Sequence, residues 1–252
     1  LDFYESKQEK LNQSFVNFGE NLPFYGYILL NLDDPNIRRI SKDIHRRHIT
    51  FGFSLKNRFQ ITDVSLKNGI QKFKITDHTI KKHYKFSTNL IGKHNLYNVT
   101  AAICVAIEEN ISIKNISKGL NDFQGVSRRF EVSNVNFFDE PRILIDDYGH
   151  HPVEISATIQ SIRQKFPRKK ICMIFEPHRF TRTQQLFDDF VKVLSKVDSL
   201  LLLDIYPACE KPIKGISSKK LIFEIAKNHK NAVYIGKTDP LLWLKSNYEN
   251  FS

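Results

Sequence analysis

The chain has 252 residues, 41% of them hydrophobic and 26% charged, which is the composition of a globular protein and excludes a wholly disordered one. No stretch approaches the roughly 18 apolar residues of a membrane-spanning helix, and three widely spaced cysteines argue against a disulfide framework and favour a cytoplasmic setting. The net charge of +11 comes from basic pairs scattered along the chain, which favours a solvated surface attractive to small anions over a nucleic-acid-binding face.

In chain order, the first half of the sequence alternates helical and β-type patterns. Helices are predicted from Phe3 to about Glu20, after Asp33-Asp34-Pro35, over 95–109 and over about 112–121. Strands are predicted over 27–32, 49–53, 59–62 and 71–75, with Asn68-Gly69 as the hairpin turn between the last two. The segment 123–125 then marks a boundary, so the predicted domains are 1–124 and 125–252.

The second half alternates strands with amphipathic helices. Strands are predicted over 143–145, 171–175, 200–203 and 232–235. Helices are predicted to begin at Pro152, near Thr183 and near Ser217. Three successive β-α units predict a parallel sheet covered by helices.

Polar motifs follow three of these strands at the point where each strand ends. They occupy 146–152, 176–183 and 204–210. Ligands of open α/β sheets bind outside the carboxyl ends of the strands. We therefore expect the three loops to converge on one site.

Two arginines and two histidines stand out within these loops. Arg179 and Arg182 at the mouth of a helix are suited to a carboxylate or a phosphate, although one of them pairing with Asp188 or Glu176 at the surface is the simpler alternative. His150-His151 are candidates for a base, for metal ligands or for helix-capping residues.

The first half carries a further polar motif at the start of the helix over 95–109. Asn95 either caps that helix or, with Asn98 one turn on, contacts a purine edge. Further along, Arg128-Arg129 precede a strand, where phosphate contact and pairing between domains both remain open.

Together these motifs resemble the Mur ligase family of peptidoglycan synthesis, and within it the alanine-adding branch. The matching segments run through almost the whole chain: 21–26, 92–98, 125–130, 146–152, 177–183 and 206–210. The last one departs from the family at Cys209, where Gly is common, which leaves the local backbone conformation open.

The resemblance implies an α/β fold that is the C-terminal part of a Mur ligase central ATPase domain (1–124), followed by a Rossmann-like parallel-sheet C-terminal ligase domain (125–252). The chain begins at Leu1, its only methionine is Met173, and it lacks a Gly-rich phosphate loop. The family's histidine ligand for magnesium would stand just before Leu1-Asp2-Phe3-Tyr4. We therefore expect a truncated ligase that is inactive by itself.

The implied reaction joins L-alanine to the lactyl carboxylate of UDP-N-acetylmuramate through an acyl phosphate, with ATP and Mg²⁺ as cofactors. By resemblance, Asn95 and Asn98 would hold adenine, Arg129 would reach the phosphates and Asp147 would contact the ribose. The alanine pocket would comprise Tyr148, His150, Arg179 and Arg182, and the catalytic roles would fall to Arg129, His150 and Arg179. His94 and Arg128 are expected to be structural. No metal ligand is assigned, and the oligomeric state stays open.

Three alternatives remain at this stage. The first is a metal-dependent hydrolase, with ligands among Asp146, Asp147, His150, His151 and His178. The second is a nucleic-acid-binding module, suggested by the net charge alone. The third is the related ligase that recycles a muropeptide, against which the segment 178–182 argues.

Overall fold

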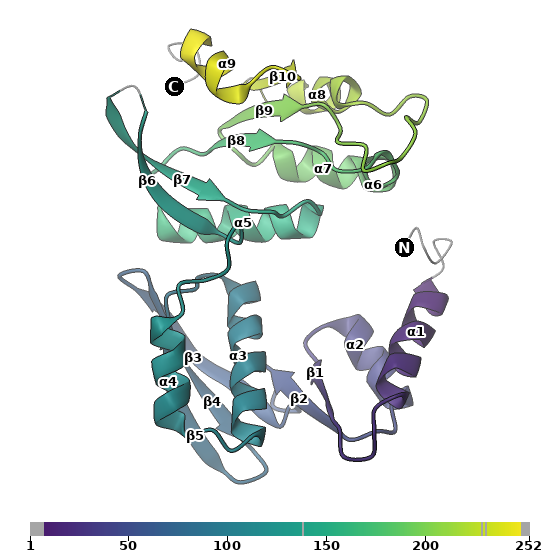
Figure 1. Cartoon of the computed structure of the whole chain (residues 1–252), viewed down its shortest axis with the longest axis vertical. Coiled ribbons are helices and arrows are strands. Elements are labelled where there is room, and N and C mark those ends of the chain that lie inside the picture. Colours follow the sequence, from purple (N-terminus) through teal and green to yellow (C-terminus); the bar gives the residue numbers. More distant parts are fainter. Residues whose placement is uncertain (1–7, 138, 228, 230, 248–252) are drawn as a thin grey trace. The chain divides into compact units, whose positions relative to one another are not determined.

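The computed structural model describes residues 8–137, 139–227, 229 and 231–247. The chain divides into two compact units, Leu1–Gly125 and Val126–Ser252 (Figure 1). In the part of the chain that is described, no helix is long and apolar enough to span a membrane.

The first unit is built on a five-stranded mixed sheet. Its strands are β1 (Ile28–Asn31), β2 (His48–Gly52), β3 (Phe59–Lys67), β4 (Ile70–Asp77) and β5 (Lys82–Thr88), in that spatial order. The first three pair in parallel and the last three antiparallel. The strand β5 was not among the predicted ones, because residues 82–85 are mostly polar and the apolar alternation is short.

Helices and one 3-10 turn accompany the sheet in the first unit. They are α1 (Gln8–Glu20), α2 (Pro35–Ile40), the 3-10 turn η2 (Ser41–Asp43), α3 (Lys93–Glu108) and α4 (Ile113–Asp122). Asp34 caps α2, as its side chain accepts hydrogen bonds from the N–H groups of Asn36 and Ile37. Of the helix predicted from Phe3, residues 3–7 lie outside the described residues, and so does the segment 1–4.

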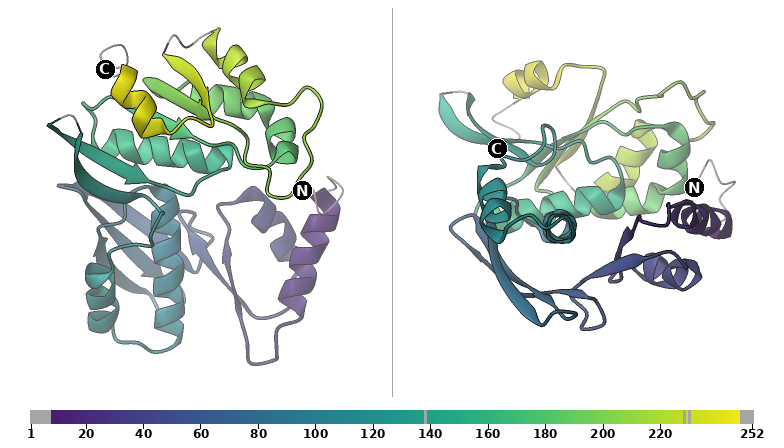
Figure 2. Two further views of the ribbon diagram at one scale, coloured as in Figure 1. Left: turned by 45° about the horizontal axis from the view of Figure 1, so that its top comes forward. Right: turned by 60° about the horizontal axis from the view of Figure 1, so that its bottom comes forward.

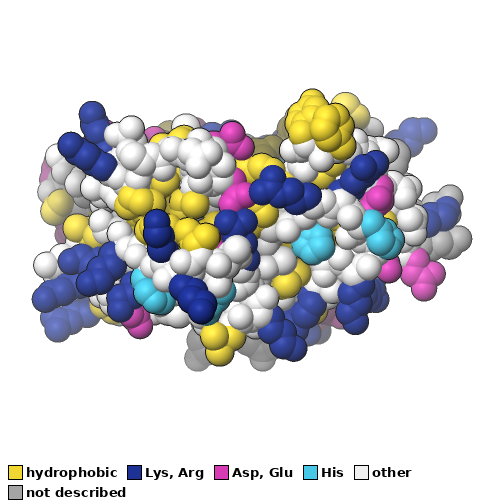
Figure 3. Space-filling model, turned by 90° about the horizontal axis from the view of Figure 1, so that it is seen from below, with side chains coloured by type: hydrophobic (Ala, Val, Ile, Leu, Met, Phe, Trp, Pro, Cys, Tyr) yellow, Lys and Arg dark blue, Asp and Glu magenta, His cyan; other side chains and the backbone are white. Residues whose placement is uncertain are grey.

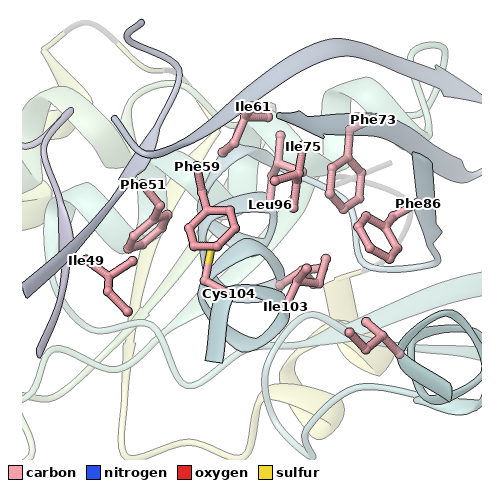
Figure 4. Packing of buried hydrophobic residues seen from close by; sticks show 12 residues of the cluster. Ile49, Phe51, Phe59, Ile61, Phe73, Ile75, Phe86, Leu96, Ile103 and Cys104 are labelled. Carbon is pink, nitrogen blue, oxygen red and sulfur yellow. The ribbon is translucent and has the colours of Figure 1, made fainter. Parts of the chain in front are cut away.

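The hydrophobic core of the first unit lies between the sheet and the helices α3 and α4. The right view of Figure 2 shows both helices on the same side of the curved sheet. In Figure 4, Phe59, Ile75 and Phe86 from the strands point toward Ile103 and Cys104 of α3. The predicted turn at Asn68-Gly69 is confirmed, and both residues have positive φ, 51° and 74°. That conformation is the one that a two-residue hairpin turn requires.

The second unit has a three-stranded parallel sheet and a separate antiparallel hairpin. The sheet order is β10 (Ala232–Gly236), β9 (Ser199–Leu203) and β8 (Cys172–Phe175), and the hairpin joins β6 (Glu131–Phe137) to β7 (Glu140–Asp146). The helices are α5 (Pro152–Lys165), α6 (Phe180–Gln185), α7 (Phe187–Leu194), α8 (Ser218–Ala226) and α9 (Pro240–Asn247). Apolar residues of α5, α7 and α8 share one core with the sheet.

Two predictions for this unit were wrong. The strand predicted over 143–145 lies in β7, which pairs with β6 in the hairpin rather than joining the parallel sheet. The short connection between β6 and β7 favours this local antiparallel pairing. The helix predicted near Thr183 begins at Phe180, and it breaks at Leu186 before α7 starts.

Candidate active site

Two of the polar loops continue the pairing of β8 and β9 beyond the ends of these strands. His178 and Tyr206 form an isolated parallel bridge. The N–H of Tyr206 donates to the carbonyl of Pro177 at 2.8 Å, and the N–H of Arg179 donates to the carbonyl of Tyr206 at 2.9 Å. Backbone hydrogen bonds therefore fix the second and third predicted loops side by side.

A column of four rings brings the first loop to the other two. The ring centroids of Tyr148 and His150 are 5.3 Å apart, those of His150 and His178 are 5.4 Å apart, and those of His178 and Tyr206 are 5.3 Å apart. His178 and Tyr206 stack with an interplanar angle of 25°. The three strand-end loops thus meet in one cluster, as the sequence predicted.

Arg179 pairs with the third loop instead of either predicted acid. Its Nε lies 3.3 Å from Oε1 of Glu210, so the alternative partners Asp188 and Glu176 were wrong. Thr181 donates to the same carboxylate from its hydroxyl at 2.6 Å and from its N–H at 3.0 Å. Partial burial opposes ionisation of Glu210, but the Thr181 hydrogen bonds and the Arg179 charge outweigh it and lower the pKa of this carboxyl. Glu210 therefore holds Arg179 in place.

Arg182 lies in α6, three residues beyond Arg179, and reaches back over the helix start. Its Nη1 lies 3.3 Å from the carbonyl oxygen and 3.4 Å from Nδ1 of His178. Partial burial and the positive charge of Arg182 lower the pKa of His178. A neutral His178 is therefore favoured between two arginines.

The first loop is shaped by carboxylates that accept backbone N–H groups. Asp147 accepts from the N–H of Phe130 at 2.9 Å and from that of Gly149 at 2.7 Å. Glu154 accepts from His150 and His151, while Nδ1 of His151 accepts from Val153 in a capping box. His151 is thus the N-cap of α5, whereas the ring of His150 lies in the aromatic column.

The segment just before β6 has a strained backbone that is held by hydrogen bonds to Glu131. Arg128 and Phe130 have positive φ, 57° and 53°, which is uncommon for residues other than glycine. Glu131 accepts from the N–H of Arg128 at 2.9 Å and from the hydroxyl of Ser127 at 3.0 Å. The guanidinium carbon of Arg128 lies 4.9 Å from the Tyr148 ring centroid, and that of Arg129 lies 5.9 Å from it. Both arginines therefore belong to the cluster around the first loop.

Asn95 and Asn98 lie on α3 of the first unit. Gly92, with φ of 102°, is the N-cap of α3, so the alternative in which Asn95 caps this helix was wrong. Asn95 is in the first turn, where its side-chain amide donates to the carbonyl of Ile91 at 2.9 Å. Asn98 is exposed one turn further along the helix, and His94 is half-buried beside Asn95. The two asparagines share the start of α3, as predicted.

Sequence reasoning missed Asp33, which lies two residues after the end of β1. Its Oδ2 accepts from the N–H of Phe53 at 2.7 Å and from the hydroxyl of Tyr97 at 2.8 Å. The position of Asp33 at a strand end was the signal, and the same rule had identified the three loops of the second unit. In the sequence, Asp33 belongs to the segment Asp33-Asp34-Pro35, which predicts the start of a helix.

The metal-dependent hydrolase finds no support in this geometry. Among the residues that the structure describes, no three His, Cys, Asp or Glu side chains gather as a metal site requires. Of the proposed ligands, Asp147 is engaged with backbone N–H groups and His151 caps α5.

The basic residues do not concentrate on the face drawn in Figure 3. Lys and Arg side chains are spread over this face among uncharged ones. A nucleic-acid-binding protein usually gathers them in one patch or stripe. This distribution gives the nucleic-acid alternative no support.

The comparisons with known proteins agree with the fold. Residues 1–106 match the family model described as Mur ligase middle domain, and residues 128–242 match the model described as Mur ligase, glutamate ligase domain. The chain therefore belongs to the Mur ligase family.

Within that family, the chain is similar to UDP-N-acetylmuramate–L-alanine ligases. It is 42% identical over 227 residues to the one of Wigglesworthia glossinidia brevipalpis and 43% identical over 236 residues to that of Baumannia cicadellinicola. The matches cover 88% and 91% of this chain and 48% of each relative, so the chain spans about half the length of the curated relatives that it matches.

Solved structures share the fold at lower identity. The UDP-N-acetylmuramate-alanine ligase of Thermotoga maritima superposes with a TM-score of 0.71 at 22% identity, over 94% of this chain and 48% of that one. A MurF ligase from the same organism, solved in complex with ADP, gives a TM-score of 0.68 at 15% identity, over 98% of this chain and 52% of that one.

Proposed function

We propose that the chain is the C-terminal half of a UDP-N-acetylmuramate–L-alanine ligase, which acts in the cytoplasm in peptidoglycan synthesis. The observation that carries this proposal is the cluster of three strand-end loops, in which two guanidinium groups border a column of tyrosine and histidine rings. The relatives at 42–43% identity carry that name.

The second unit would bind L-alanine. The side chains of Arg179 and Arg182 would take its carboxylate, since both guanidinium groups border the ring column. Tyr148 and His150 would line the same site from the first loop. The lowered pKa of His178 favours its neutral form, which adds no further positive charge near the incoming amine.

The first unit and the segment before β6 would contact ATP. Asn95 uses an amide hydrogen on Ile91, which leaves its side-chain oxygen to accept from the adenine amino group, and the exposed Asn98 lies one turn away. Arg129 would reach the phosphates and Asp147 the ribose. Arg128 and Glu131 would keep Arg129 in its strained turn.

The reaction begins when the lactyl carboxylate oxygen of UDP-N-acetylmuramate attacks the γ-phosphorus of ATP and ADP leaves. The alanine amine then attacks the carbonyl carbon of the acyl phosphate and a C–N bond forms. The bond between this carbon and the phosphate oxygen breaks, so that phosphate leaves, and the amine loses a proton. Arg129 and Arg179 would stabilise the negative charge that gathers in both steps, and His150 would help to orient the acyl phosphate.

The residues present do not fit a resident magnesium site. The described part of the chain gathers no three carboxylate or imidazole groups, and the sequence lacks a phosphate loop with its lysine. We therefore propose that the chain alone binds nucleotide weakly and catalyses no ligation, whereas the full-length ligase uses ATP with Mg²⁺.

Two measurements test this function. The first is phosphate release with UDP-N-acetylmuramate, L-alanine, ATP and Mg²⁺; turnover by this chain alone would contradict the proposal that it catalyses no ligation by itself. The second is an NMR titration of the chain with L-alanine, with D-alanine as the control. Shifts at Tyr148, His150 and Arg179 for the L form are expected, and equal or absent shifts for both forms would count against the alanine site.

A further inference from the structure

One carboxylate ties together three segments at the strand ends of the first unit. Asp33 follows β1, and its Oδ2 accepts from the N–H of Phe53 and the hydroxyl of Tyr97 at 2.7 Å and 2.8 Å. Its Oδ1 accepts a longer bond of 3.4 Å from the N–H of Ser54. The end of β1, the loop after β2 and the second turn of α3 thereby share one acceptor group.

The backbone at the last residue of β2 is shaped to admit this carboxylate. Gly52 has φ of 148°, and a Cβ added there would lie 2.6 Å from Oδ1 of Asp33. A contact that short is not tolerated between carbon and oxygen, so any larger residue at 52 would displace Asp33. The close approach therefore depends on glycine at this position.

Tyr97 is held on its other sides as well. Its ring meets Phe51 and Phe53 edge-to-face, at centroid distances of 6.4 Å and 5.6 Å. The ammonium of Lys93 lies 5.6 Å from its ring centroid and 5.2 Å from that of Phe53. Partial burial, together with the hydrogen bond to Asp33, raises the pKa of Tyr97, so its hydroxyl remains a donor.

The start of α3 carries the two asparagines assigned to adenine, and Tyr97 stands between them in the sequence. We infer that Asp33 and Tyr97 are positioning residues for the nucleotide: their hydrogen bond fixes the first two turns of α3 against the strand ends and thereby sets where Asn95 and Asn98 meet the base. This inference rests on the proposed nucleotide site.

The test is an NMR titration of the whole 252-residue chain with ADP to millimolar concentrations, following the side-chain amides of Asn95 and Asn98. Tyr97→Phe removes only the hydroxyl and should weaken ADP binding by roughly threefold to tenfold, as expected for one lost hydrogen bond. Binding of L-alanine to the second unit should stay unchanged in this variant.

The matched control breaks a similar bond at the other end of the same helix. The hydroxyl of Tyr27 donates to Glu109 at 3.1 Å, just beyond the last residue of α3, and Tyr27→Phe should leave ADP affinity unchanged. Asp33→Asn, which keeps one oxygen acceptor, should retain more affinity than Asp33→Ala.

Each other outcome counts against the inference. Unchanged ADP affinity in Tyr97→Phe overturns it while the proposed nucleotide site stands. An equal loss in Tyr27→Phe assigns the effect to general stability and overturns it too. Absence of any shift at Asn95 and Asn98 in the unmodified chain overturns the nucleotide site and this inference together.

Discussion

Each unit contains an ion pair that the other can be compared with, and the two pairs differ in burial. In the first unit, Asp77 is fully buried and Glu108 is 9% exposed, and both pair with Arg58. In the second unit, the Arg179–Glu210 pair is 41% and 18% exposed, and it lies at the meeting point of three loops. A buried ion pair has lost its hydration and interacts with protein groups alone, so its role is to stabilise the fold. A half-exposed ion pair keeps hydrogen-bond donors that a ligand can reach.

The largest effect is expected for the buried ion pair between Asp77 and Arg58. Asp77→Ala should lower the free energy of unfolding of the first unit by about 3–5 kcal/mol, because it removes a fully buried carboxylate that pairs with Arg58. Urea unfolding followed by NMR signals of the first unit would measure it. The control Asp63→Ala removes the exposed partner of Lys74 and should change stability by less than about 1 kcal/mol. Equal losses in both variants would contradict the distinction by burial.

The next largest effect is expected in the half-exposed cluster of loops in the second unit. Arg182→Ala should weaken L-alanine binding about tenfold to a hundredfold, the value of roughly 1.5–3 kcal/mol for a hydrogen bond to a charged group. Titration of the chain with L-alanine measures it, and the exposed Arg168→Ala in the same unit serves as the control. In the full-length ligase the change should appear chiefly in the KM for L-alanine. A loss of ADP affinity with unchanged alanine binding would refute the assignment.

Much of the fold was predictable because it follows from local patterns. The apolar periodicity of α3, the Asn68-Gly69 turn and the helix start at Asp33-Asp34-Pro35 all depend on a few neighbouring residues, and each prediction was confirmed. The pairing of β7 with β6 was not predictable from periodicity, since the same apolar run suits a parallel sheet or a hairpin. That choice depends on which strand lies beside β7 in the folded unit, which is a property of the tertiary structure.

The candidate site shows the same division between local and distant information. That the three loops meet followed from their shared position at strand ends. The partner of Arg179 could not be predicted in the same way. Glu210 holds it, rather than Asp188 or Glu176, although Glu210 lies 31 positions further along the chain and only the fold brings the two together. Asp33 was missed because it ends a strand, and its contact with Tyr97 spans 64 positions.

A smaller effect follows from the protonation of Glu210. Its pKa in the folded unit lies below the ordinary value of 4.5, so the carboxylate stabilises the second unit above about pH 4.5 and that contribution is lost as the pH falls through the folded pKa. Glu210→Gln should therefore reduce the stability at neutral pH and flatten the acid side of the profile. Fluorescence of Trp243, the only tryptophan, follows unfolding of this unit across pH. An unchanged acid slope would show that Glu210 gains nothing from Arg179 and Thr181.

The smallest expected effect lies at Cys209, beside Glu210, where the resemblance to the family predicts glycine. Cys209 has φ of 68°, a left-handed conformation that costs a residue other than glycine about 1–2 kcal/mol. Glycine also gains about 0.4–1 kcal/mol of entropy in the unfolded chain, so Cys209→Gly should stabilise the second unit by a net 0.5–1 kcal/mol, or roughly 2–4 °C in Tm. Asn68→Gly is the control in the first unit: Asn68 has φ of 51°, but asparagine tolerates this region, so little gain is expected. A larger gain at Asn68 than at Cys209 would show that the strain at Cys209 is relieved by its surroundings.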